Sequence, residues 1–144
     1  MTRSRRALIQ RFAAFPERIA SAARTADGTP PVGEWTPEEV IRHLIAVETG
    51  VHQSRLLELA INDDPQWSWI EPRPWSAEPD LDLDGVLERF AAMRATTVAN
   101  VAALDADGWA RTGTHATFGP LDVGGLLGIA IHHDEEHLRG LATD

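Results

Sequence analysis

Residues 35–44, WTPEEVIRHL, contain the clearest helix start in the chain. Thr36 is a favourable N-cap, Pro37 suits the first helical position, and Glu39 completes a capping box with Thr36. Apolar residues then recur at three- and four-residue steps, at Val40, Leu44, Val47 and Val51. The pattern predicts an amphipathic helix that runs to about Ala60, where the turn-forming residues 62–65 end it.

The same helical period appears in three other segments. They run from about Arg3 to Arg24, from just after Asp82 or Asp84 to about Leu104, and from near Asp122 to about Leu141. Residues 27–33 are rich in Gly and Pro and predict a loop, and residues 105–120 predict a turn-rich connection. Residues 66–81 form a long linker with three tryptophans, which we expect to fold over the other segments. The whole chain, residues 1–144, is therefore predicted to be one all-α domain, a four-helix bundle with a long crossover between helices 2 and 3.

Composition excludes several classes of protein. The chain has 144 residues, no cysteine and a formal net charge of -9, so neither disulfides nor a thiolate metal site is available. A negative net charge disfavours a nucleic-acid partner. The sequence contains neither an apolar run long enough for a membrane span nor a secretory signal pattern, and we expect a cytoplasmic protein without a membrane partner.

Three histidines point to a shared metal ion. His133 and His137 are four residues apart, so they lie one turn apart on the same apolar face of the last helix. His43 lies beside the apolar stripe of the second helix. Three imidazoles suit one divalent ion (zinc, nickel or iron), and three protein ligands leave a coordination position open, as catalytic sites do.

Several neighbours of these histidines are candidates for supporting roles. Gly50 and Ser54 follow His43 on nearly the same helical azimuth. Because both side chains are small, we expect space for a substrate beside His43. Asp134 and Glu136 belong either to a solvated acidic face or to the groups that orient an imidazole. No residue is an obvious general base, and Glu48 and Asp134 are the candidates.

The other three histidines do not join this set. On a straight helix His52 points opposite to His43, and His132 points about 120° away from the pair. We therefore expect both side chains to lie at the surface or in an interface. For His115, in the connection before the last helix, we expect a capping or hydrogen-bonding role.

Taken together, the chain resembles the DinB-like superfamily, the DinB/YfiT-like metalloenzymes. The matching stretches are residues 35–44, then Gly113-Thr114-His115 with Gly119 and Leu121, then residues 130–138. The resemblance implies an up-and-down bundle with a long crossover, and a metal ion held by His43, His133 and His137. It also implies a homodimer, as for many members, and activities such as S-transfer with a low-molecular-weight thiol (mycothiol or bacillithiol) or isomerisation of maleylpyruvate.

We favour a metal-dependent enzyme that acts on a small molecule. Thiol S-transfer is the first candidate reaction, and hydrolysis is the second. Residues 133–137 also fit the H-x-x-E-H pattern of inverted zinc proteases, but only seven residues follow His137. A di-iron bundle needs Glu-x-x-His pairs, whereas Glu39 and Glu48 precede histidines by four. The alternative from another class is a non-catalytic bundle that binds a metal or an apolar ligand.

Overall fold

The computed structural model describes residues 1–26, 30 and 33–142. Most of the loop predicted over residues 27–33 therefore lies outside the described residues. In the described part of the chain, four long helical rods form the bundle: α1 (Arg3–Thr25), the continuous rod α2 (Pro37–Val47), η1 (Glu48–Gln53) and α3 (Ser54–Ile61), then α4 (Leu83–Ala102) and α6 (Val123–Ala142). The four-helix bundle with its long crossover between helices 2 and 3 is confirmed.

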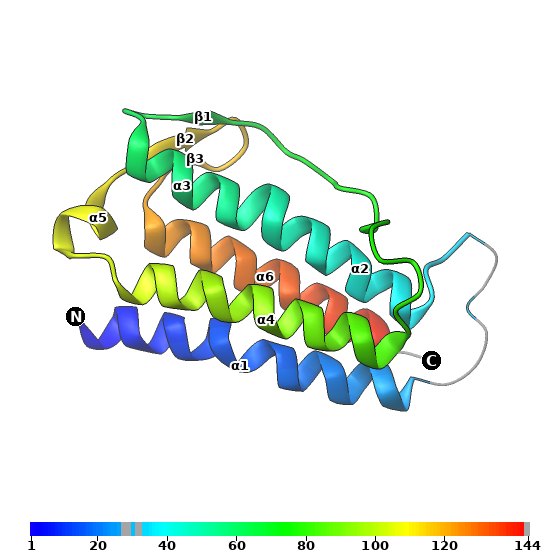
Figure 1. The fold of residues 1–144 in the computed structure, drawn as a ribbon. Helices are drawn as coiled ribbons and strands as arrows, with labels where there is room; N and C mark the ends of the chain where they lie inside the picture. The colour runs from blue at the N-terminus through cyan, green and yellow to red at the C-terminus, as the bar shows by residue number, and fades with distance from the viewer. Residues whose placement is uncertain (27–29, 31–32, 143–144) are drawn as a thin grey trace.

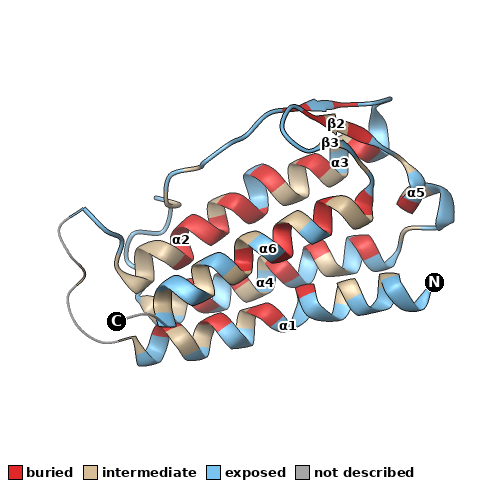
Figure 2. Ribbon diagram, turned by 180° about the vertical axis from the view of Figure 1, so that it is seen from behind, coloured by how far each residue is buried: buried red, intermediate tan, exposed pale blue. Residues whose placement is uncertain are grey.

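The chain reverses direction from α1 to the α2–α3 rod, and the crossover then returns along the bundle, so that α4 runs parallel to that rod (Figure 1). The chain then reverses direction again, and α6 runs parallel to α1 and packs beside it (Figure 1). The predicted capping box at the start of α2 is present, with Thr36 Oγ1 accepting from the Glu39 amide and Glu39 accepting from the Thr36 amide. Buried residues cover the faces that the rods turn toward one another (Figure 2). No described helix is long and apolar enough to cross a membrane.

The second rod contains a π-helical turn, which the hydrophobic pattern does not predict. In η1 the backbone hydrogen bonds run from i to i+5, so each turn holds more residues than an α-helical turn does. Side chains after η1 are therefore rotated relative to those of a straight α-helix. This turn changes which residues of α3 face the interior of the bundle.

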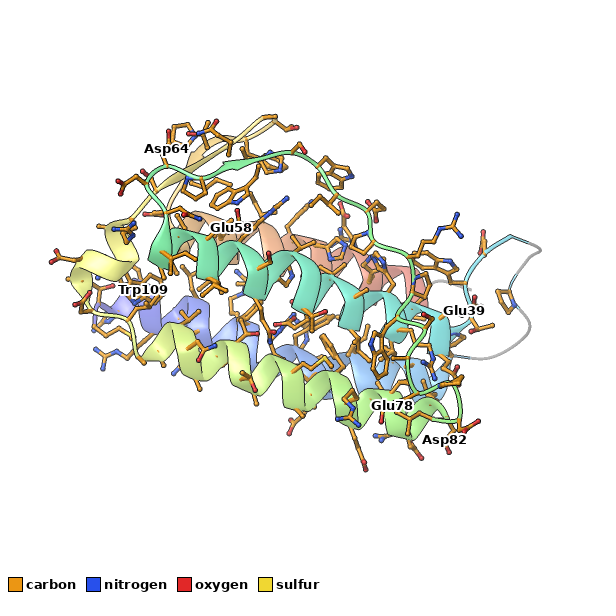
Figure 3. All side chains as sticks on the ribbon, turned by 45° about the horizontal axis from the view of Figure 1, so that its top comes forward. Glu39, Glu58, Asp64, Glu78, Asp82 and Trp109 are labelled. Carbon is orange, nitrogen blue, oxygen red and sulfur yellow. The ribbon has the colours of Figure 1, made fainter. Side chains whose placement is uncertain are left out.

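The crossover packs on the bundle, as its tryptophan content predicts. The guanidinium of Arg42, buried in α2, donates to the carbonyls of Trp75, Ala77, Glu78 and Leu81 at 2.9 to 3.2 Å. Figure 3 shows Glu78 at the end of the bundle where the crossover enters α4. Trp67 is buried, whereas Trp69 is 58% exposed, so the packed crossover leaves one of its tryptophans largely in contact with solvent.

A small sheet closes the other end of the bundle. β1 (Gln66–Trp67) pairs in parallel with β2 (Gly113–His115), and β2 pairs antiparallel with β3 (Gly119–Leu121). The connection before β2 also contains the short helix α5 (Ala106–Ala110). This sheet fixes the start of the crossover against the start of α6.

Candidate metal centre

The structure brings the three predicted imidazoles together. His43 comes from α2, and His133 and His137 come from successive turns of α6. One ring nitrogen of each lies within 4.8 Å of the others, and Nε2 of His133 lies 3.2 Å from Nε2 of His137. His43 is fully buried, whereas the other two are half-buried. These three side chains form a group that could hold a metal ion.

The crossover sets the tautomer of His43. Its Nδ1 lies 2.7 Å from the carbonyl oxygen of Pro72, which can only accept, so Nδ1 carries the proton and donates. In the neutral ring Nε2 then presents its lone pair, and this buried atom has no hydrogen-bond partner among the described residues. A histidine held through Nδ1 by a backbone carbonyl is the usual arrangement for an imidazole that binds metal through Nε2.

The surroundings keep all three rings neutral at neutral pH. Burial, and then the neighbouring rings of His137, His52 and His43 together with Arg94, lower the pKa of His133 to about 3. Burial also lowers the pKa of His43, against the opposing effects of the Pro72 hydrogen bond and of Glu71. Burial and the proximity of His43 lower the pKa of His137. Neutral imidazole is the form that binds metal.

The spacing of His133 and His137 fits a shared divalent ion. Two metal–nitrogen bonds of about 2.0–2.1 Å at a tetrahedral angle separate the nitrogens by about 3.3 Å. The separation of 3.2 Å between the Nε2 atoms of His133 and His137 agrees with that value. The unpartnered lone pair of His43 supplies the third donor.

Glu71, on the crossover, is a site residue that the helical pattern could not identify. Its Oε1 lies 3.7 Å from Nε2 of His43, and its Oε2 accepts a hydrogen bond of 3.1 Å from Nε1 of Trp69. Two groups that carry lone pairs, the carboxylate and the Nε2 of His43, thus lie side by side. A cation between them would relieve their repulsion.

The two residues considered as general bases have another partner. Arg94, 1% exposed in α4, donates to Oε1 of Glu48 at 2.9 Å and to both carboxylate oxygens of Asp134 at 2.9 and 3.1 Å. Asp134 is therefore not on a solvated face, and its carboxylate accepts from Arg94 rather than from an imidazole. Burial raises the pKa of Asp134 to about 6, although Arg94 opposes the shift.

A small pocket adjoins the triad, but the predicted residues do not line it. Its volume is about 50 Å³, and its lining includes Val51, His52, Arg55 and His133. Gly50 is exposed, and Ser54 donates to the carboxylate of Glu58. The π-helical turn accounts for this difference, because it rotates the residues after Glu48 away from the azimuths of a straight helix.

For the same reason the surface position predicted for His52 is wrong. Its ring lies in the pocket and meets Phe12 edge-on, with ring centroids 6.1 Å apart. His132 is exposed, as predicted, and pairs with Glu136 at 3.0 Å. Glu136 therefore lies on the solvent side of α6.

The hydrogen-bonding role predicted for His115 is confirmed. This buried side chain accepts through Nδ1 from the amides of Thr117 and Phe118, at 3.0 and 3.4 Å, and so holds the turn between β2 and β3.

The fold and this group of side chains define a class: four-helix bundles whose second and last helices bring three histidines together beneath a crossover. The DinB superfamily model matches residues 1–141, and the chain belongs to the DinB superfamily. No curated protein sequence matches the chain.

Among solved structures, the chain is similar to YfiT from Bacillus subtilis, described as a probable metal-dependent hydrolase with an unusual four-helix bundle topology. The two share 18% sequence identity with a TM-score of 0.73, over 99% of this chain and 86% of YfiT. At that identity the likeness concerns the fold.

Proposed function

We propose that the chain is a metal-dependent enzyme that acts on a small molecule, with one divalent ion held by His43, His133 and His137. The observation that carries the proposal is the buried, unpartnered Nε2 of His43 beside the Nε2 atoms of His133 and His137. When bound, a divalent ion supplies Lewis acidity that lowers the pKa of a water or thiol. Zinc, nickel and iron all accept imidazole.

Within this proposal the protein's own residues orient the site and move a proton. Pro72 fixes the His43 ring, and Trp69 Nε1 holds the Glu71 carboxylate so that Oε1 lies toward the triad. Glu71 would accept the proton of the nucleophile at Oε1 and replaces Glu48 and Asp134 as the candidate base, since Arg94 engages both of those.

The reaction class has two candidates. Thiol S-transfer follows from the resemblance to DinB-like transferases, and hydrolysis matches the description of YfiT. We also propose that the chain forms a homodimer and is located in the cytoplasm. In both reactions the substrate would lie in the pocket beside His133 and in the groove of about 460 Å³ that shares Trp69, Ile129 and His133 with it.

Substitution of Glu71 by Gln tests the catalytic part of the proposal. We expect metal-loaded Glu71→Gln to keep its metal and to lose about 10²- to 10⁴-fold in turnover, the usual contribution of a general base. The assays are conjugation of monobromobimane with low-molecular-weight thiols and hydrolysis of p-nitrophenyl esters, with the exposed Glu88→Gln as the matched control.

Two outcomes would contradict this reading. Loss of metal from Glu71→Gln would make the carboxylate a fourth ligand and the site a closed one. Turnover of the metal-loaded wild type no higher than that of His137→Ala in either assay would favour the non-catalytic bundle.

A further inference from the structure

Arg55 is a buried cation on the wall of the pocket beside the triad. It is 8% exposed and lines the same pocket as His133. Among the described residues its guanidinium donates from Nη2 to the carbonyl of Ser68, at 2.8 Å, and has no ion-pair partner. Burial of a guanidinium without a paired anion is costly, and burial lowers the pKa of Arg55.

Glu58 is the acid that acts on the charge of Arg55, but the two side chains form no ion pair. The carboxylate of Glu58 instead accepts hydrogen bonds from Trp67 Nε1 and from Ser54 Oγ, each at 3.3 Å. Its charge raises the pKa of Arg55 without a direct contact. Figure 3 shows Glu58 between α3 and the crossover. The aromatic ring of Trp67 gives the guanidinium a cation–π contact at 5.7 Å.

His115 presents a second unsatisfied donor. Since Nδ1 accepts from two backbone amides, the proton of the neutral ring lies on Nε2, and this buried atom has no partner among the described residues. The residue is 1% exposed, and burial, followed by the charge of Arg55, lowers the pKa of its ring. His115 pairs in register with Trp67, the residue that contacts Arg55.

We propose that Arg55, assisted by the Nε2–H of His115, binds the carboxylate of the substrate, which is therefore a small apolar molecule with one anionic group. A carboxylate would satisfy both donors and neutralise the cation, and hydrogen bonds to a charged group are the stronger kind. The rest of the substrate would lie against Trp69, Phe118 and Ile129 in the adjoining groove. The inference rests on the proposed function for the identity of the pocket as a substrate site.

Binding of phenylacetate and of its neutral isostere phenylacetamide to metal-free protein tests the inference. Calorimetric titration of the wild type should show phenylacetate binding about 10- to 100-fold more tightly than the amide, the range expected for charge-assisted hydrogen bonds. Arg55→Gln should bind the two ligands equally, Arg55→Lys should keep part of the preference, and the exposed Arg24→Gln should keep all of it.

A second variant separates recognition from folding. His115→Asn keeps an acceptor near the position of Nδ1 and removes the Nε2 donor, so it should reduce the preference while the thermal unfolding curve remains cooperative. Equal binding of the two ligands by the wild type, no binding of phenylacetate at 10 mM, or a preference that survives in Arg55→Gln would each overturn the inference. Because these titrations contain no metal, they do not depend on whether the histidine triad binds an ion.

Discussion

The imidazole of His43 keeps one hydrogen bond inside the bundle, from Nδ1 to the carbonyl of Pro72. That single bond decides which nitrogen carries the proton, and so which nitrogen can bind a metal. The sequence predicted His43 as an inward residue from its place beside the apolar stripe of the helix. It could not predict Pro72 or Glu71, because both lie in an irregular segment whose path follows from tertiary contacts.

His52 makes the stability of the protein depend on pH. Burial, and then the charges of Arg94 and Arg55, lower its pKa to about 3. The unfolded chain binds a proton near pH 6.5, whereas the folded chain does not until about pH 3. The free energy of unfolding should therefore fall as the pH falls below about 6.5, by about 1–2 kcal/mol between pH 7 and pH 5 from this residue.

Urea unfolding of metal-free protein at pH 5, 6 and 7 measures this effect. His52→Gln should show a smaller loss of stability toward pH 5 than the wild type does. The exposed His132→Gln is the matched control and should follow the wild type. Identical pH profiles for the wild type and His52→Gln would show that His52 is not held neutral in the folded protein.

At the scale of elements, one arginine joins four segments of the bundle. Arg94 of α4 donates to the carbonyl of Phe12 in α1, to Glu48 in η1 and to Asp134 in α6. Its guanidinium also lies 3.7 Å from the ring centroid of Phe12. The hydrophobic pattern of α4 does not distinguish this residue from an exposed arginine, because an arginine on a helix is usually solvated.

Replacement of Arg94 by Met should destabilise the protein by about 3–5 kcal/mol, since two buried carboxylates would lose their counter-charge. Urea unfolding at pH 7 measures the change, with the exposed Arg89→Met as the control on the same helix. The triple variant Arg94→Met/Glu48→Gln/Asp134→Asn should recover part of the loss. A single variant as stable as the wild type would contradict the role given to Arg94.

Arg42 performs a comparable role for the crossover. Its guanidinium donates to four crossover carbonyls, and the Trp75 amide donates to the carbonyl of Arg42 at 2.9 Å. Arg42→Met should release residues 72–81 and expose Trp75, seen as faster limited proteolysis within the crossover. Arg73→Met, at an exposed position of the same segment, should be cleaved at the wild-type rate. Equal cleavage rates for all three proteins would show that Arg42 does not hold the crossover.

The sequence predicted elements where a regular period was sufficient. The capping box at Thr36 and the four amphipathic segments specified the helices and their approximate ends. The π-helical turn was not predictable, because the apolar residues of this segment have a spacing that is equally compatible with a regular α-helix. That one turn is the reason that His52 and Arg55, rather than Gly50 and Ser54, line the pocket.

At the scale of the whole molecule, the long crossover decides what the bundle can do. It returns over the rod of α2, η1 and α3, so that α4 runs parallel to that rod (Figure 1). Its residues Glu71 and Pro72 contact His43 of the triad, and Trp69 holds the Glu71 carboxylate. The length and tryptophan content of the linker predicted a packed cover. The contacts of that cover could not be predicted, because strands of two or three residues such as β1 and β2 depend on pairing between distant segments.

The metal content of untagged protein tests the central claim most directly, by inductively coupled plasma mass spectrometry. We predict about one zinc, nickel or iron per wild-type chain, its loss in His43→Ala and His137→Ala, and its retention in His132→Ala, which removes an exposed histidine from the same helix. Absence of metal from the wild type after incubation with each ion, or equal metal content in all four proteins, would contradict a metal centre formed by His43, His133 and His137.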